Sequence, residues 1–514
     1  MSIFKGAMPR LALWSGLFGV VAAQAQLVHN CPPVSPTEFK MTTLVDRPMG
    51  IEEPIKMALD MDAAGNVDIY FVERQGKVKK FTGATKTLAT IGTVNIFVGY
   101  EDGLTGIVLD PAFKTNHNMF LYYSQGTKDV FHFRVARFTL NAQGMLDMAT
   151  EKPILEIPAI ASHMHTGGAM QFDGAGDLWI TTGENQSGEE GPPNTNDLRG
   201  KILRIHPTPD GAYTVPAGNL FPPGTAKTRP EIYIMGCRNP YSIALDPARH
   251  AVAWGDIGPD GQGQTEEHDF AVAPGNFGYP YFAGNNITLS GTAPASAPVN
   301  NNSKNTGLNN LPPAQPAMDP YQQLAAITGP IYRYNGSLQS NVKFPPHFDG
   351  LWFVADFQNN EMDTISLNKA GTAMIAKAKV FPTLKITNLL DMKTGPDGAL
   401  YILNYAGFFT ASAQTGIVRI DYTGSCRPDI ATAIAAPEKS MVQARGMMVE
   451  VEASQGRHEL AIGNLQGRTL ATFKGEGAMA YDVAGAVGNH PGLYIAKLTT
   501  AAGVFSRTLI LGGR

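Results

Sequence analysis

The sequence predicts an all-β fold, namely a six-bladed β-propeller followed by a small C-terminal β-sandwich. Charged residues make up only 16% of the 514 residues, whereas 55 glycines and 36 prolines supply many turns. No long stretch shows the periodicity of an amphipathic helix. A short motif also recurs, in which a turn with Asp and Gly leads into an apolar strand that contains an aromatic residue. Together these features favour sheets.

The recurring motif predicts the number of blades. Its clear copies and one looser copy are "LDMDAAGNVDIYFVER" (59–74), "LDPAFKTNHNMFLYYS" (109–124), "FDGAGDLWITTGE" (172–184), "LDPARHAVAWGDIG" (245–258), "GPDGALYILNY" (395–405) and, more loosely, "FPPHFDGLWFVADF" (344–357). Each copy alternates as a half-buried strand after a tight turn does. Irregular repeats of this kind suggest blades of a propeller. A sandwich with similar hairpins is the alternative that the pattern leaves open.

Two stretches of the sequence lack the recurring turn-and-strand motif. The segment 283–334 is rich in Asn, Pro, Ala and Ser and is expected to form a long loop at the rim. After Cys426 the composition changes, and short alternating runs predict a separate β-sandwich over 437–514. The propeller is therefore expected over 26–427, with a linker at 428–436.

The N-terminus is typical of an export signal. Lys5 and Arg10 precede the apolar run 11–23, and Ala-Gln-Ala follows as a small-x-small cleavage site. We expect a signal peptide over 1–25 and a secreted, periplasmic or cell-surface protein, although a buried N-terminal helix is the alternative. No later stretch predicts a transmembrane segment. The net charge of −4 gives no electrostatic case for nucleic acid.

The three cysteines flank or lie within the predicted propeller. Cys31 and Cys426 stand near its two ends, so a disulfide between them would join these ends; two unpaired thiols are the alternative. Cys237 lies between them. No pair has CxxC spacing, which excludes a zinc knuckle and an attached c-type haem.

The stretch "HMHTGGAMQFDGAGDLWITTGEN" (163–185) contains a candidate general base. His165 enters a predicted blade strand and Glu184 stands at the other end of that strand, and a propeller points such strand and loop ends at its central channel. A carboxylate that fixes the tautomer of an imidazole makes it a serviceable base. His163 competes for this role, and a purely structural histidine is the alternative.

A second constellation follows at Arg238-Asn239-Pro240. Arginine suits carboxylates and polarised carbonyl oxygens, although a structural salt bridge would also explain it. The loop "GDIGPDGQGQTEEHDF" then offers the carbonyl groups of Gly258 and Pro259 with several acidic residues nearby. Oxygen donors on a turn suit calcium, but the spacing is not that of an EF-hand. A solvated acidic loop is the alternative.

These stretches together resemble the soluble quinoprotein glucose/sorbosone dehydrogenase family. The resemblance covers roughly Thr42 to Tyr422 and rests on ordered motifs: "EDGLTGIVLDPAF", "HTGGAMQFDGAGDLWITTGEN", "NTNDLRGKILRIHP", "RPEIYIMGCRNPYSIALDP", "GDIGPDG", "APGNFGYPYFAG" and "GPDGALYILNYAG" with "GIVRIDY". It implies a six-bladed propeller, pyrroloquinoline quinone (PQQ) in the channel mouth, calcium (Ca²⁺) beside it, and oxidation of an aldose to a lactone.

The resemblance also implies roles for individual residues. His165 matches the base, Glu184 the carboxylate behind it, and Arg238 the group that holds the quinone oxygen, with Asn239 beside it in the cofactor pocket. The remaining matches are the calcium ligands Gly258 and Pro259 with Glu266 or Glu267 nearby, and Glu101 or Asp102 at the place of a substrate-contacting amide.

The chain departs from the family where further basic residues should bind the carboxylates of the cofactor. It has Gln358 and Asn359 at one such place, and 388–390 ("NLL") at another. An unpaired carboxylate in a partly buried site is costly. The candidates to replace these groups are Arg333, Lys385 and Lys393, of which Lys385 is the one assigned to the cofactor.

The C-terminal stretch resembles the sorting domain of type IX secretion substrates, through "QGR", "PGLYIAKL" and a closing apolar strand. This implies the secretion machinery as a partner, and a plain accessory sandwich is the alternative. The sequence as a whole predicts an exported enzyme that oxidises a sugar or a related alcohol with PQQ and calcium and passes electrons to an external acceptor, since it has no haem motif. A non-catalytic propeller that binds carbohydrate or protein is the first rival, and a calcium-dependent lactonase is the second.

Overall fold

The computed structural model describes residues 34–260, 265–322, 325–407, 411–426, 442–451, 456–464, 468–490, 492–500 and 503–511. The chain divides into two compact units, Met1–Arg427 and Pro428–Arg514. The prediction of an all-β protein is confirmed. Among the described residues, helical structure is limited to short turns: α1 Phe113–Asn116 and the 3₁₀ turns η1 Pro36–Glu38, η2 Arg47–Met49, η3 Gly188–Glu190 and η4 Pro346–Phe348.

The described residues of the first unit form six sheets of four or more strands, which are antiparallel except for one short parallel pair (β14 with β18). The strands of the first three sheets are β2 Pro54–Met61, β3 Val67–Glu73, β4 Lys77–Thr82 and β5 Thr87–Thr93; β6 Leu104–Leu109, β7 Asn118–Gly126, β8 Phe131–Leu140 and β9 Leu146–Pro158; and β10 Gly167–Phe172, β11 Leu178–Thr182, β12 Lys201–Pro207, β13 Tyr213–Thr214, β14 Ile232–Met235 and β18 Gly275–Asn276.

The strands of the other three sheets are β15 Pro240–Asp246, β16 Ala251–Asp256, β17 Glu266–Ala271 and β21 Asp319–Tyr321; β22 Ala326–Ile331, β23 Trp352–Asp356, β24 Glu361–Leu367 and β25 Met374–Lys379; and β26 Leu389–Thr394, β27 Leu400–Asn404, β28 Gly416–Tyr422 and β1 Phe39–Asp46. A separate small hairpin pairs β19 Phe282–Ala283 with β20 Ile287–Thr288. Most of this hairpin lies within the segment 283–334 expected to be a long rim loop, and so do β21 and β22, so this part of the prediction is wrong: the segment also supplies strands to two of the six sheets.

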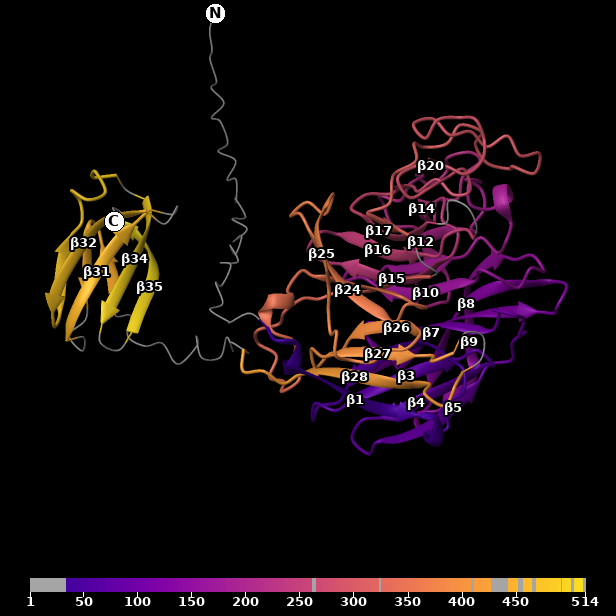
Figure 1. Ribbon diagram of the computed structural model, residues 1–514, viewed down its shortest axis with the longest axis horizontal. Coiled ribbons are helices and arrows are strands. Elements are labelled where there is room, and N and C mark those ends of the chain that lie inside the picture. Colours follow the sequence, from indigo (N-terminus) through magenta and orange to yellow (C-terminus); the bar gives the residue numbers. More distant parts are fainter. Residues whose placement is uncertain are drawn as a thin grey trace, which may run out of the picture. The chain divides into compact units, whose positions relative to one another are not determined.

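The first strands of the six sheets form a closed ring. Strand β2 contacts β6, and the contacts continue through β10, β15, β22 and β26 back to β2. The last sheet is completed by the N-terminal strand β1, which pairs with β28 from Phe39 opposite Tyr422 to Asp46 opposite Gly416. Figure 1 shows β1 in indigo beside β28 in orange. A ring of this kind is propeller-like, because corresponding ends of its inner strands surround one axis.

The central strands of the sheets are largely buried, whereas the outermost strand β25 is exposed along its length. Strand β8 alternates buried and partly exposed residues, but every residue of β11 and β16 is buried. Large aromatic side chains fill the spaces between sheets, such as Tyr122, Phe133 and Trp352, which are at most 2% exposed. This packing holds the ring and the loops at its mouth in place.

The second unit contains two further sheets. One consists of β29 Val442–Arg445, β30 Met448–Val451 and β33 Met479–Asp482, and the other of β31 Arg457–Gly463, β32 Thr469–Glu476, β34 Gly492–Thr500 and β35 Gly503–Leu511. Residues of both sheets share one apolar core, which includes Val449, Leu460 and Leu498. Strand β31 alternates strictly, with one face buried and the other facing outward.

Several predictions fall on residues that the structure does not describe. The expected signal peptide (1–25), Cys31 and the expected linker (428–436) lie outside the described residues. Cys426 is disulfide-bonded, while Cys237 is a buried free thiol. No helix in the described part of the chain is long and apolar enough to cross a membrane.

Candidate active site

A cavity of about 420 Å³ lies where the inner strands of the ring begin. Every sheet gives it a residue at or next to the start of its first strand, and these residues are Ile55, Thr105, Thr166, Tyr241, Ile327 and Leu390. Loop residues complete the lining, among them Arg74, Tyr100, Glu101, Met164, His165, Arg238, Asn239, Ile257, Asp260, Phe357, Gln358 and Tyr405. Segments more than 300 positions apart therefore meet at one site.

His165 and Glu184 form a buried imidazole–carboxylate pair beside this cavity. Nδ1 of His165 lies 2.6 Å from Oε1 of Glu184, and the two residues are 6% and 2% exposed. A carboxylate accepts, so it places the proton on Nδ1 and leaves Nε2 as the ring nitrogen free to take another proton. Since His165 lines the cavity, the pair has the arrangement of a general base.

The backbone around His165 is held in an unusual conformation. Its φ angle is 55°, in the left-handed region that only glycine adopts freely. The N–H of His165 donates to Oε2 of Glu101 at 2.6 Å, and the carbonyl oxygen of His165 accepts from the N–H of Asn185 at 3.2 Å. Gly183 runs so close that a Cβ there would lie 1.9 Å from the same carbonyl oxygen. The surrounding chain thus fixes the base.

Glu101 and Asp102, the predicted substrate residues, have different positions. Glu101 lines the cavity, and burial raises the pKa of its carboxyl, against the opposing effects of His165 and Arg238. Asp102 is fully buried and points to His163, with Oδ2 2.6 Å from Nδ1 of that ring. Neither Asp102 nor His163 lines the cavity. Of the two predicted carboxylates, Glu101 is the one that a substrate in this cavity would meet.

Arg238 and Asn239 also line the cavity, and Asp256 holds their backbone. The N–H groups of Arg238 and Asn239 both donate to the carboxylate of Asp256, at 2.9 Å and 2.6 Å. Burial raises the pKa of Asp256 to about 6. Asn239 accepts from the N–H of Gly167 at 3.1 Å. Sequence reasoning grouped Asp256 with a cation loop, whereas its bonds show that it orients the arginine turn.

The guanidinium of Arg238 has two oxygen neighbours in the loop after β16, and it also interacts with the hydroxyl of Tyr279. Its Nη1 donates to the carbonyl oxygen of Ile257 at 3.0 Å, and Nη2 lies 3.8 Å from the carboxylate of Asp260. The Asp260 side chain is 93% exposed, so this ion pair is weak. Arg238 therefore keeps capacity to bind a ligand oxygen in the cavity.

The four predicted calcium ligands do not share one set of bonds. Glu266 turns its Oε2 to the N–H groups of Gly258 and Ala326, at 3.2 Å and 2.9 Å, and burial raises its pKa to about 7. Glu267 accepts from the N–H of Gly284, and burial raises its pKa as well. Neighbouring residues of a strand point to opposite faces, so Glu266 and Glu267 lie on different sides of β17.

Gly258 and Pro259 lie between Ile257 and Asp260, two residues of the cavity lining, but do not line it themselves. In the described part of the chain, no three His, Cys, Asp or Glu side chains are grouped so that they could hold a metal ion. A calcium ion at this loop would thus depend on backbone carbonyl groups and on the ligand itself.

The positions at which the family resemblance implies further cations do not place a positive charge in the cavity. Gln358 and Leu390 line the cavity, as their places in the sequence imply, but they are uncharged. Lys385 is exposed and is not part of the lining. Arg333 bonds to Asp246 and Lys393 lies 3.5 Å from Asp391, so both basic side chains have other partners.

Sequence reasoning missed a second cation in the cavity. Arg74, directly after β3, donates from Nη1 to the carbonyl oxygen of Gly99 at 2.8 Å and pairs through Nη2 with Glu53 at 3.2 Å. It also missed the aromatic lining, which consists of Tyr100, Tyr241, Phe357 and Tyr405. The position of Arg74 at the end of a buried strand, before a Gln-Gly turn, was the available signal.

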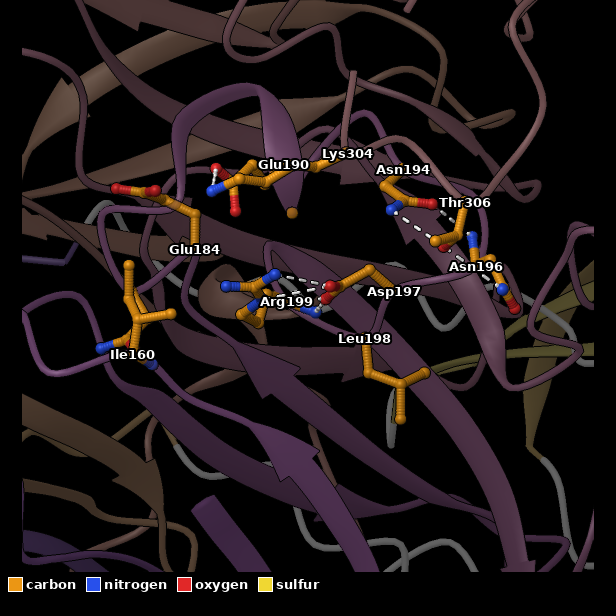
Figure 2. A network of polar contacts seen from close by, with 12 residues as sticks. Ile160, Glu184, Glu190, Asn194, Asn196, Asp197, Leu198, Arg199, Lys304 and Thr306 are labelled. Atoms are coloured by element: carbon orange, nitrogen blue, oxygen red, sulfur yellow. Dashed lines mark hydrogen bonds and ion pairs between the residues drawn. The ribbon is translucent and has the colours of Figure 1, made fainter. Parts of the chain in front are cut away.

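The segment that carries Glu184 is tied to the long Asn- and Pro-rich segment (Figure 2). Asn194 and Asn196 both donate to Oγ1 of Thr306 at 3.3 Å, and Lys304 pairs with Glu190 at 2.7 Å. Closer to the cavity, the N–H of Gly188 donates to Oε2 of Glu184 at 3.0 Å. The carboxylate behind the base is therefore anchored on both sides.

Comparisons with known proteins identify the family and agree with this fold. The model of the family described as Glucose / Sorbosone dehydrogenase matches residues 51–407. Aldose sugar dehydrogenase YliI of Escherichia coli strain K12 is 26% identical over 316 residues, which cover 61% of this chain and 76% of that protein.

Two solved structures share the fold. The apo-form of the soluble aldose sugar dehydrogenase of Escherichia coli has a TM-score of 0.56 at 21% identity, and covers 75% of this chain and 99% of its own. The PQQ-bound aldose sugar dehydrogenase of Streptomyces coelicolor has a TM-score of 0.54 at 20% identity, and covers 76% of this chain and 99% of its own. Because the family model spans well over half of the sequence, the chain belongs to the glucose/sorbosone dehydrogenase family.

Proposed function

We propose that this protein oxidises an aldose, or a related sugar alcohol, in the cavity at the mouth of the ring. The observation that carries the proposal is the convergence of the His165–Glu184 pair and the Arg238 guanidinium on one cavity. A base and a fixed cation facing one space can remove a hydroxyl proton and stabilise negative charge on an oxygen. We also propose that the six sheets are the six blades of a propeller and that the second unit is a β-sandwich.

PQQ is the oxidant that we propose, and the lining fits it in part. Two guanidinium groups, Arg74 and Arg238, line the same space, and aromatic rings provide flat apolar walls. These features suit a planar anion. Arg238, Asn239 and Arg74 would hold it, and the carbonyl groups of Gly258 and Pro259 would hold calcium beside it. When bound, the quinone supplies the acceptor for the hydride of the sugar, and its two electrons pass on to an external acceptor.

The residues of the chain have the following roles in this proposal. His165 accepts the hydroxyl proton of the substrate at Nε2, while the carbon of the same group loses a hydride. Glu184 stabilises the resulting imidazolium through Nδ1–H, at 2.6 Å. Arg238 stabilises negative charge on an oxygen in the cavity, and the apolar walls exclude water.

Reconstitution tests the proposal. Purified full-length protein is mixed with PQQ and calcium, and the reduction of a dye is followed with a series of aldoses. We expect turnover and a rise in melting temperature with the cofactor, and both effects should be lost in Arg238→Met. If PQQ neither changes the melting temperature nor supports turnover of any aldose, the proposal is wrong.

One observation favours a second function, the binding of carbohydrate or protein without catalysis. Gln358 and Leu390 line the cavity at places where cofactor-binding members of the family carry cations. In that case glycans would bind with the same affinity to His165→Ala and to the unmodified protein, and no quinone spectrum would appear. Hydrolysis of lactones without an electron acceptor would instead indicate a lactonase.

Export and attachment to the secretion machinery through the second unit are further parts of the proposal. The disulfide at Cys426 supports an oxidising compartment, since such bonds persist outside the cytoplasm. Deletion of residues 437–514 should abolish delivery to the cell surface or medium without loss of dye reduction in the cell extract. Normal delivery of the shortened chain would exclude a sorting role.

A further inference from the structure

The charged groups of the cavity are paired, with one exception. Arg74 pairs with Glu53 at 3.2 Å, His165 with Glu184 at 2.6 Å, and Arg238 lies 3.8 Å from Asp260. Glu101 lines the same cavity, yet none of the ion pairs found among the described residues includes its carboxylate. Glu101 therefore presents a carboxylate that forms no direct ion pair among the described residues, although His165 and Arg238 lie near enough to oppose the rise in its pKa.

The carboxylate of Glu101 is fixed where it is. Its Oε2 accepts the N–H of His165 at 2.6 Å, and its own N–H donates to the carbonyl oxygen of His163 at 2.8 Å. These two bonds join the loop of Glu101 to the loop of the base, and the first of them holds the carboxylate beside His165. Burial raises the pKa of this carboxyl, and a cation bound beside it would oppose that effect.

We propose that Glu101 makes the cavity selective for aldoses that carry an ammonium group, in preference to neutral aldoses and uronic acids. The proposal rests on the proposed sugar oxidation, and it concerns the substrate class of the same cavity. Because Glu101 bonds to the backbone of the base itself, a sugar whose reacting hydroxyl meets His165 presents its remaining substituents to this carboxylate. An ammonium group there gains a charge-assisted hydrogen bond.

Neutral and acidic sugars lack this gain. A neutral hydroxyl can donate to Glu101 but brings no opposite charge, and the carboxylate of a uronic acid repels it. Each effect in a partly buried site is expected to change affinity about tenfold. The expected order of affinity is therefore amino sugar, neutral sugar, uronic acid.

Two measurements on the full-length protein test this order. Dissociation constants and kcat/KM are measured for glucose, its 2-amino and 6-amino deoxy analogues, and glucuronate, at a pH where the amines are protonated. We expect at least one amino sugar to bind about tenfold more tightly than glucose and to have a kcat/KM about tenfold higher. Glucuronate should be the poorest ligand. In Glu101→Gln the affinity and kcat/KM for the amino sugar should become about equal to those for glucose. The reason is that glutamine keeps an acceptor for the N–H of His165 but has no charge.

Two variants serve as controls. Asp260→Asn removes a charge from the same lining, but the Asp260 side chain is 93% exposed and screened by solvent. The preference for amino sugar over glucose should therefore stay within about twofold of that of the unmodified protein. Glu101→Asp keeps the charge and should keep the order of ligands. Glucuronate that binds the unmodified protein as well as the amino sugars do, or a preference for amino sugar over glucose that is unchanged in Glu101→Gln, would overturn the proposal. Charge-ordered binding without turnover would leave selectivity intact and refute the oxidation instead.

Discussion

The backbone N–H of Glu184 donates to the carbonyl oxygen of Arg238 at 2.7 Å. One hydrogen bond thus joins the residue that supports the base to the residue that supplies the cation. Asn239, next in the chain, accepts from the N–H of Gly167, two residues after His165. These bonds explain why the base and the cation face one cavity although they come from different sheets.

The Glu184 carboxylate is expected to control the basicity of His165. Glu184→Gln keeps the shape of the side chain but removes the charge that stabilises the imidazolium. We expect kcat to fall about 100-fold, because the imidazolium formed in the reaction loses its counter-charge. Glu190→Gln is the matched control, because that carboxylate lies in the same segment but pairs with the exposed Lys304. Equal effects of the two variants would contradict the role of Glu184.

Substitution of the two histidines decides which one is the base. His165→Gln should reduce kcat about 100-fold or more, whereas His163→Gln should reduce kcat much less, because His163 does not line the cavity. Both variants should be destabilised by about 2 kcal/mol, because Asp102 and Glu184 are both buried and each would lose its imidazole partner. The rings of Phe97 and Phe131, whose centroids lie within 5.3 Å of the His163 ring, add to this loss in His163→Gln. Thermal unfolding measures the destabilisation, and initial rates on both variants would show the reverse pattern if His163 were the base.

A single methyl group should displace the base. In Gly183→Ala the new Cβ would lie 1.9 Å from the carbonyl oxygen of His165, which is too close for any contact, so the His165 segment must move. We expect a loss of activity of about 100-fold and a lower melting temperature. Gly174→Ala is the control, because a Cβ there meets nothing within 4 Å. Full activity of Gly183→Ala would show that the position of His165 is not critical.

Sequence reasoning could predict the all-β fold and the family because both depend on local patterns. The turn and strand motifs repeat, and the motifs around His165 and Arg238 are contiguous. The cavity lining was harder to predict, because each sheet contributes only one or two residues at the start of its first strand. Arg74 and Tyr405 come from separate loops, and no sequence pattern links them.

The predicted calcium ligands show a different limit of what can be predicted from the sequence. The run "TEEHDF" offered two adjacent glutamates as equivalent candidates, and only the strand position distinguishes them. Glu266 bonds to the N–H groups of Gly258 and Ala326, whereas Glu267 bonds to that of Gly284. The alternation of side chains along a strand places the two on different sides of β17, but the start of β17 had to be known first.

Lys56 gives a prediction about stability and pH. The Lys56 residue is 3% exposed. Its neighbour Ile55 lines the candidate active-site cavity, and its other neighbour, Met57, lines a second cavity that is formed by later residues of the inner strands. Its Nζ is 3.3 Å from the carbonyl oxygen of Leu390 and 3.5 Å from the centre of the Tyr241 ring. Burial lowers its pKa to about 7, although Asp391 opposes this effect.

The sign of the pH effect follows from this lowered pKa. Between about pH 7 and the ordinary lysine value of about 10.4, the unfolded chain binds the proton of Lys56 and the folded chain does not. The contribution of Lys56 to the free energy of unfolding therefore increases as pH rises through this window, and it is least favourable below it. Lys56→Met removes this dependence, so the variant should gain most stability, relative to the unmodified protein, near about pH 6.

Lys201 is the matched comparison for this prediction. Burial lowers its pKa to about 7 as well, but its Nζ donates to three carbonyl oxygens, those of Gly191, Pro192 and Arg199, at 2.9, 3.0 and 2.7 Å. Lys201→Met leaves these buried acceptors without donors and should therefore be less stable than Lys56→Met at each pH, although both variants lose the same kind of pH dependence. Chemical unfolding of both variants between about pH 6 and 10 separates the two cases. A destabilised Lys56→Met that retains the original slope would show that the single bond to Leu390 and the contact with Tyr241 outweigh the cost of burying the charge.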